Sequence, residues 1–188
     1  MIMIRNTHED LLNELEKYET ISIEEENSKS QTIKFLRTND IVFGTKNIEG
    51  HVTASAWIVN KERSKVLMTH HKILDIWIQL GGHTDEGETP YQAGLREGYE
   101  ESGLKNINEI EKSIFDIDVH YFPETKNKKA HYHYDFRYIF EADEKDEIIV
   151  SNESKDVKWI SFNELEKYTS ETALFRMREK SRSSKANS

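Results

Sequence analysis

The sequence contains no cysteine among its 188 residues. A disulfide framework and thiolate chemistry are therefore excluded, and nothing points to an oxidising compartment. Basic residues are not in excess either, because 26 lysines and arginines face 35 acidic residues and the net charge is -9. Proteins that bind nucleic acids usually carry a basic stripe, so this composition argues against a nucleic acid as the main partner.

Long apolar runs are also missing. The N-terminal stretch MIMIRNTHED lacks the apolar segment of a signal peptide. No apolar run approaches the roughly 18 residues that a membrane-spanning helix needs. We therefore expect a cytoplasmic protein that contains no membrane segment. The length fits one domain with a substantial core, and no internal repeat suggests a second domain.

The most informative stretch runs from 81 to 104, with the sequence GGHTDEGETPYQAGLREGYEESGL. Thr89 is a good N-cap, with Pro90 at the first helical position and Gln92 at the third, so that a capping box can form. Gly103 suits the left-handed conformation that ends many helices. The pattern predicts a helix over residues 90–102.

Three glutamates share one face of this predicted helix. Glu97, Glu100 and Glu101 are spaced i, i+3 and i+4, which places their carboxylates on one stripe. Like charges so close together repel one another, whereas a hard divalent cation would turn the repulsion into coordination. The stripe therefore suggests Mg²⁺ or Mn²⁺. A solvated acidic face is the alternative, because 32% of the residues are charged.

The glutamates belong to a longer set of fixed spacings, formed by Gly82, Glu88, Arg96, Glu97, Glu100, Glu101 and Gly103. This set resembles the signature of the Nudix family, metal-dependent hydrolases that cleave a diphosphate linked to another moiety. Gly98 departs from the family pattern, which prefers an aliphatic residue there. The resemblance implies an α/β fold, namely an α/β/α sandwich with a mixed sheet, here with an N-terminal helical extension.

The resemblance also implies roles for individual residues. Glu97, Glu100 and Glu101 would ligate Mg²⁺ or Mn²⁺ together with the backbone carbonyl of Gly81. Arg96 would orient a carboxylate through a charge-assisted hydrogen bond. The expected reaction is the hydrolysis of a phosphoanhydride bond, in a nucleoside diphosphate derivative or a nucleoside triphosphate, by a metal-activated water.

The general base is less defined. Some family members supply it from a glutamate in the loop before the last strand, and Glu153 occupies that place here. Glu147 and Asp156 are nearby, and Glu100 or Glu101 can serve instead. We expect Glu100, Glu101, Arg96 and Glu153 to form the catalytic set.

A second informative stretch is HYHYDFRYIF, over residues 131–140. Strand alternation puts His131, His133, Asp135 and Arg137 on one face and five aromatic residues on the other, which we expect to be core. The polar face is either a self-contained hydrogen-bonded network or a substrate-binding surface, and we expect substrate binding. The stretch resembles one in a bacterial Nudix subgroup that also carries GGH at the loop and has no assigned substrate.

Three other functions were weighed. An isomerase of isopentenyl diphosphate with the Nudix fold needs a cysteine, which this chain lacks. A non-catalytic nucleotide-binding sensor would usually show a decayed carboxylate set, and this set is complete. A mononuclear metal site built from histidines is weakened by their spacing, which is not that of tight metal ligands; the candidates are His70, His71, His83, His131 and His133.

The remaining segments fix the expected domain organisation. Residues 1–45 should form two helices that pack on the core or contribute to a homodimer contact. Residues 46–180 should form the hydrolase domain, and residues 181–188 a disordered tail. Within the domain, patterns predict strands over 52–59, 65–71, 76–82, 113–122, 131–140 and 156–160, and helices over 162–168 and 171–180.

Overall fold

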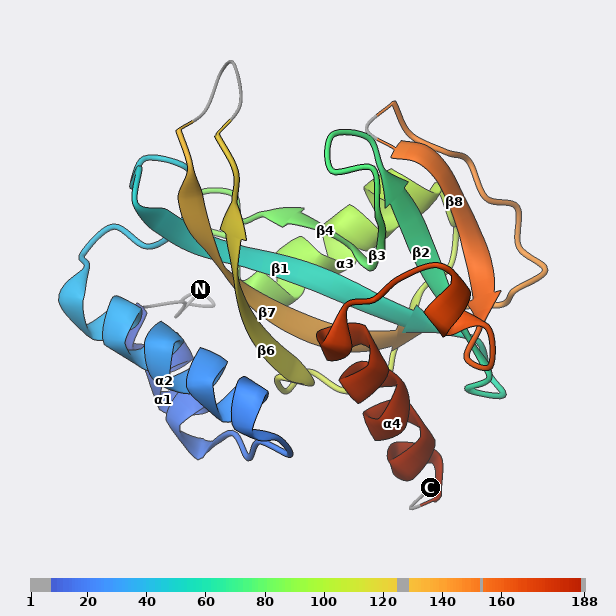
Figure 1. The fold of residues 1–188 in the computed structure, drawn as a ribbon, viewed down its shortest axis with the longest axis horizontal. Helices are drawn as coiled ribbons and strands as arrows, with labels where there is room; N and C mark the ends of the chain where they lie inside the picture. Colours follow the sequence, from blue (N-terminus) through green and yellow to red (C-terminus); the bar gives the residue numbers. More distant parts are fainter. Residues whose placement is uncertain (1–7, 125–128, 153, 187–188) are drawn as a thin grey trace, which may run out of the picture.

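The computed structural model describes residues 8–124, 129–152 and 154–186. Eight strands in these ranges form one mixed sheet with helices against it (Figure 1). In chain order the elements are α1 (His8–Lys17), α2 (Ile23–Thr38), β1 (Gly50–Val59), β2 (Lys65–His71), β3 (Trp77–Ile78), β4 (Leu80–His83), α3 (Pro90–Ser102), β5 (Asn108–Glu109), β6 (Asp116–Phe122), β7 (His131–Glu141), β8 (Ser154–Ser161), the short 3-10 helix η1 (Leu165–Lys167) and α4 (Thr172–Ala186).

Two long parallel strands, β1 and β7, form the centre of the sheet. They pair along their whole length, from Gly50 opposite Tyr132 to Val59 opposite Glu141. The other edge of β1 is shared, because β4 pairs with its middle residues, 53–56, and β2 with its last residues, both antiparallel. The predicted hairpin of 52–59 and 65–71 is confirmed. The stretch 76–82 is not one strand but two short ones, β3 and β4, which are separated at Gln79.

Helices cover both faces of the sheet, as the predicted α/β/α arrangement requires (Figure 1). The α3 helix lies close to β1, and a Cβ added at Gly98 would come within 3.3 Å of the Ala56 side chain. On the opposite face, α4 packs over Trp57, whose indole Nε1 donates to the Ser181 hydroxyl at 2.8 Å. The predicted fold class is confirmed, and the small residues of α3 explain how its backbone approaches the sheet.

The ends of α3 follow the predicted capping pattern. The Thr89 hydroxyl accepts from the Gln92 amide N–H at 3.0 Å, and the Gln92 side chain accepts from the Thr89 N–H at 3.0 Å. Gly103 adopts a left-handed conformation with φ of 65°, and its N–H bonds to the Tyr99 carbonyl. The helix spans Pro90–Ser102, so its position was fully encoded by local sequence.

The two N-terminal helices pack against the sheet. Leu11 and Leu15 of α1 and Leu36 of α2 are buried in the main core. Phe35 of α2 stacks on Tyr134 of β7, with ring centroids 3.9 Å apart. Tyr134 is therefore held by the extension as well as by the sheet. No helix in the described part of the chain combines the length and apolarity that crossing a membrane requires.

The C-terminal helix is longer than predicted. Residues 181–186 continue α4 as a helix, so the expected disordered tail over 181–188 is wrong for these six residues; 187 and 188 lie outside the described residues. Ser181 is fully buried and its hydroxyl donates back to the Met177 carbonyl at 2.8 Å. Tertiary contacts to Trp57 hold this polar segment, and composition alone does not reveal such contacts.

A buried ionic cluster joins α2, β6 and α4. We define it as Glu25, Asp116, Arg176 and Lys180. Arg176 binds the Asp116 carboxylate through two hydrogen bonds of 2.8 Å, and Lys180 reaches the same carboxylate at 2.9 Å as well as the carboxylate of Glu25. Burial alone would raise the pKa of Asp116, but Arg176 and the nearby cations outweigh it and hold that pKa below its ordinary value.

Candidate metal-dependent active site

The three signature glutamates lie where α3 passes β4. The buried Glu101 carboxylate accepts a hydrogen bond from the Gly81 N–H at 2.8 Å. Glu97 lies against Gly82, while the side chain of Glu100 is 58% exposed. The carboxylates along the stripe thus range from the buried one of Glu101 to the exposed one of Glu100. Such a set of carboxylate oxygens is what Mg²⁺ and Mn²⁺ prefer.

Arg96 holds this carboxylate set in place. Its guanidinium binds Glu88 through two hydrogen bonds of 2.9 and 3.0 Å, and its Nη1 donates to Glu97 at 2.8 Å and to Glu100 at 3.0 Å. Its Nη2 also donates to the His83 carbonyl at 2.9 Å. One cation therefore fixes the orientation of two of the signature carboxylates and ties the loop to the helix.

Glu88 anchors the Arg96 guanidinium through two hydrogen bonds. Burial would raise its pKa, but hydrogen bonds from Arg96 and from the Asp85 N–H outweigh burial and lower its pKa from the ordinary value. The hydrogen bond to Glu88, and after it the one to Glu97, raises the pKa of Arg96. Both groups therefore stay charged near neutral pH, and the contact between Arg96 and Glu88 persists there.

Two adjacent glycines, Gly81 and Gly82, lack a side chain for different reasons. A Cβ at Gly81 would come within 2.6 Å of the Ala54 carbonyl oxygen and 2.8 Å of the Ser55 Cα, both backbone atoms of β1. A Cβ at Gly82 would instead meet the Glu97 carboxylate, with its Cδ at 2.5 Å. The first position is closed by the sheet and the second by a side chain that can rotate.

This difference gives a testable prediction. We expect Gly81→Ala to lower the free energy of unfolding by about 2–3 kcal/mol, because the β1 backbone must shift. We expect Gly82→Ala to keep nearly normal stability but to raise the Mg²⁺ concentration needed for half-maximal activity about tenfold, since Glu97 is displaced. Urea unfolding and Mg²⁺ titration of both variants measure this. Equal losses of stability in the two variants would contradict the distinction.

The polar face of β7 forms a network with its neighbours. The Asp135 carboxylate accepts from the hydroxyls of Thr53 at 3.0 Å and Ser55 at 2.8 Å, and from the Gln79 amide at 3.3 Å. It also accepts from Arg137 Nε at 2.8 Å. All these residues are buried. The strand predicted over 76–82 is interrupted at Gln79 because the chain changes partner there, from β2 to β1. The Gln79 side chain contributes to the network.

Arg137 extends this network to β6. Its guanidinium is only 4% exposed and contacts three carboxylates, Asp135 at 2.8 Å, Asp118 at 2.9 Å and Asp116 at 3.3 Å. Burial would lower the pKa of Arg137, but these carboxylates outweigh it and raise the pKa. A substrate phosphate would have to displace one of them. The expected role of Asp135 and Arg137 as substrate contacts therefore stays a prediction.

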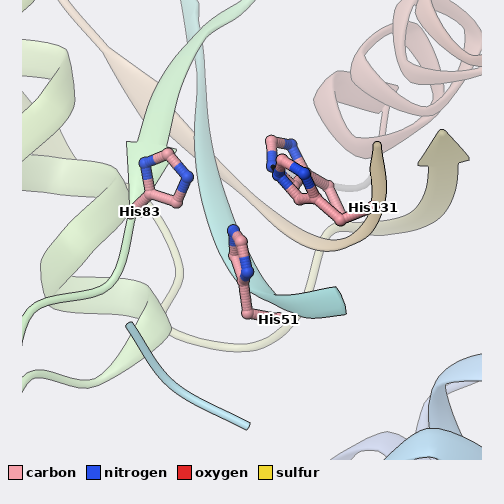
Figure 2. A group of neighbouring side chains, drawn as sticks. His51, His83 and His131 are labelled. Carbon is pink, nitrogen blue, oxygen red and sulfur yellow. Dashed lines mark hydrogen bonds between the residues drawn. The ribbon is translucent and has the colours of Figure 1, made fainter. Parts of the chain in front are cut away.

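Histidines gather at the other end of the same face. His51 of β1, His83 of β4 and His131 and His133 of β7 each offer a ring nitrogen, and these four atoms lie within 4.8 Å of one another (Figure 2). We call this group the histidine cluster. Burial first, and then the neighbouring histidines, lowers the pKa of His133 to about 2. The ring of His133 is therefore neutral at physiological pH.

The structure brings together some of the predicted residues and separates others. Of the five histidines first considered for a metal site, only three meet, because His70 and His71 lie on β2, where His70 contacts Asp75 at 2.8 Å. His51 was missed. The sequence did carry a signal for it. His51, Thr53 and Ser55 are every second residue of β1, so their side chains point to the same face of the strand. Glu153 lies outside the described residues.

Comparisons with known proteins agree with this geometry. Residues 50–180 match the model of the NUDIX domain family. A probable DHNTP pyrophosphohydrolase from Lactococcus lactis subsp. cremoris (strain MG1363) is 28% identical over 143 residues, which are 74% of this chain and 82% of that protein. The fold resembles a C. elegans Ap4A hydrolase in a binary complex, with a TM-score of 0.59 and 20% identity over 73% of this chain and 98% of the other. It also resembles the E. coli dihydroneopterin triphosphate pyrophosphohydrolase, with a TM-score of 0.50 and 17% identity over 79% and 100%.

Proposed function

Because the chain belongs to the NUDIX domain family and is a pyrophosphohydrolase, we propose that it hydrolyses a phosphoanhydride bond in a nucleotide-type substrate with the help of Mg²⁺ or Mn²⁺. The observation that carries the proposal is the stripe of Glu97, Glu100 and Glu101, held by Arg96 against β4. Three carboxylates so close together repel one another without a cation, whereas a divalent cation would be coordinated by their oxygens.

The residues present fit such a cation. All side-chain ligand atoms of the stripe are carboxylate oxygens, and the lack of a side chain at Gly82 leaves room for the Glu97 carboxylate. We propose Glu97, Glu100 and Glu101 as ligands, with the backbone carbonyl of Gly81 beside them. A divalent cation bound there neutralises phosphate oxygens and lowers the pKa of a water molecule.

The protein itself positions the reacting groups. Arg96 holds Glu97 and Glu100 in a fixed orientation, which reduces the rearrangement needed when a substrate arrives. For the base we propose Glu100, because its carboxylate is exposed enough to reach a water, whereas that of Glu101 is occupied by the Gly81 N–H. Glu153 stays the other candidate, and it precedes β8 in the sequence.

For the substrate we propose a compound in which a triphosphate is attached to a heterocyclic moiety. The Lactococcus relative is named as a probable DHNTP pyrophosphohydrolase and matches 74% of this chain, so DHNTP is the first candidate. A dinucleoside polyphosphate such as Ap4A is the second, and it rests only on a likeness of fold. The two compounds differ in charge and length, so a comparison of kcat/KM for DHNTP and Ap4A distinguishes them.

The test is a substrate panel with purified protein and Mg²⁺. We expect the highest kcat/KM with DHNTP, with release of pyrophosphate, and at least tenfold lower values with Ap4A and common nucleoside triphosphates. A preference for Ap4A would move the proposal to dinucleoside polyphosphates. Tight binding of a nucleotide without turnover would contradict it and favour the alternative of a non-catalytic nucleotide-binding sensor.

A further inference from the structure

We propose that the histidine cluster, formed by His51, His83, His131 and His133, is a structural zinc site, separate from the carboxylate stripe. Three strands that are distant in sequence supply its members, and their rings point toward a common space (Figure 2). A substrate-binding role was expected for two of these residues, His131 and His133. The present proposal assigns all four one shared zinc ion, because their ring nitrogens lie within 4.8 Å of one another.

The ring orientations support this assignment. His131 Nδ1 lies 2.7 Å from the Lys129 carbonyl oxygen, and His51 Nδ1 lies 3.4 Å from the Asn47 carbonyl oxygen. A carbonyl can only accept, so Nδ1 carries the proton in both rings and Nε2 presents its lone pair. A backbone carbonyl behind the far ring nitrogen is the usual support of a histidine that binds a metal.

The spacing of the nitrogens suits a tetrahedral ion after small movements. His131 Nε2 and His133 Nε2 are 2.9 Å apart, and the four ligand atoms span at most 4.8 Å. With zinc–nitrogen bonds of about 2.0–2.1 Å, two ligands of a tetrahedral site lie about 3.3–3.4 Å apart. This value falls between the two observed limits, so side-chain rotations of roughly an ångström complete the site.

The chemistry of the ligands separates this site from the carboxylate stripe. Neutral imidazole nitrogens favour zinc, whereas Mg²⁺ prefers oxygen and binds imidazole weakly. Burial of His51, His131 and His133 reduces competition from water. Four protein ligands fill a tetrahedron and leave no open position, which is the pattern of structural zinc.

A zinc ion there would fix the end of β4 to the two central strands of the sheet. His83 directly follows Gly82, and its own carbonyl accepts from Arg96. The ion would therefore join β4, which leads into the carboxylate stripe, to the central strands β1 and β7. We infer that zinc stabilises this end of the sheet without taking part in the reaction.

Metal content and thermal stability test the inference. Protein prepared without a histidine tag would be dialysed against ZnCl₂ and then against buffer with excess Mg²⁺, which occupies the carboxylates. We expect about one zinc per chain by mass spectrometry and a thermal midpoint about 5–10 °C above that of the metal-free protein. His51→Ala and His133→Ala should lose the zinc and the shift. His70→Ala, outside the cluster, should keep both.

Cobalt provides a measurement on the unmodified protein, in case the variants do not fold. Co²⁺ loaded in place of zinc should give the intense visible absorption of a tetrahedral site, and zinc should abolish it. The inference is overturned if the wild-type protein retains no zinc and shows neither the midpoint shift nor the cobalt spectrum. Four histidines would then only pack together. No substrate is used, so either outcome is independent of the proposed hydrolysis.

Discussion

Replacing Glu101 by Gln should lower kcat/KM with the preferred substrate about a thousandfold while leaving the fold intact. The substitution keeps the size of the side chain and an oxygen that can accept from the Gly81 N–H, a bond now of 2.8 Å. The substitution removes one negative charge from the proposed ligands of the divalent cation. Loss of metal-assisted stabilisation of about 4 kcal/mol corresponds to about three powers of ten in rate.

Two comparisons make this result specific. Glu100→Gln should show a similar loss, because Glu100 is both a proposed ligand and the proposed base. Glu171→Gln makes the same chemical change at an exposed position before α4 and should leave the rate unchanged. Steady-state kinetics at saturating Mg²⁺, with circular dichroism of each variant, measures this. Near-normal rates in both Glu100→Gln and Glu101→Gln would exclude the carboxylate stripe as the active centre.

Replacing Lys180 by Met should reduce the free energy of unfolding by about 3 kcal/mol, because removal of one partner from a buried ionic cluster leaves charge uncompensated. Lys180 contacts both Glu25 and Asp116, and both carboxylates are fully buried. In the variant Arg176 still binds Asp116 at 2.8 Å but lies 3.8 Å from Glu25, so the main cost falls on Glu25. In a domain of this size the thermal midpoint should fall by about 6–12 °C.

The matched control is Lys167→Met. Lys167 forms an ion pair with Glu164 at the surface, where both side chains are largely exposed, and such pairs contribute less than about 1 kcal/mol. Adding Glu25→Gln to Lys180→Met should cost little more, since the uncompensated carboxylate is then gone. Lys180 would not anchor α2 to α4 if Lys180→Met and Lys167→Met had the same midpoint by thermal denaturation.

Local sequence determined both ends of α3. Thr89, Gln92 and Gly103 act on backbone groups within a few residues, so α3 begins and ends where the capping pattern predicts. The spacing of the three glutamates then follows from helical geometry. The alternation of β7 was equally visible, and Phe136, Tyr138 and Phe140 are buried on the face opposite the polar residues. The expectation that all five aromatic residues are core is wrong for Tyr132, which is 46% exposed near the start of the strand.

Long-range partners could not be predicted in this way. The partners of Arg137 are Asp116 and Asp118, about twenty positions earlier, and strand pairing alone brings them together. His51 joins the histidine cluster because β1 runs parallel to β7 in one particular register. The length of α4 likewise depends on Trp57 and on the buried ionic cluster. Each of these features needs the tertiary fold, whereas caps and periodicities do not.

Dependence of turnover on a divalent cation tests the central proposal most directly. Hydrolysis of DHNTP would be followed by phosphorus NMR in protein treated with EDTA and then titrated with Mg²⁺. We expect no turnover with EDTA, full recovery with Mg²⁺, and pyrophosphate as the product, because the carboxylates of α3 repel one another and the substrate unless a cation is present. Turnover that persists in EDTA at the rate seen with Mg²⁺ would contradict the account.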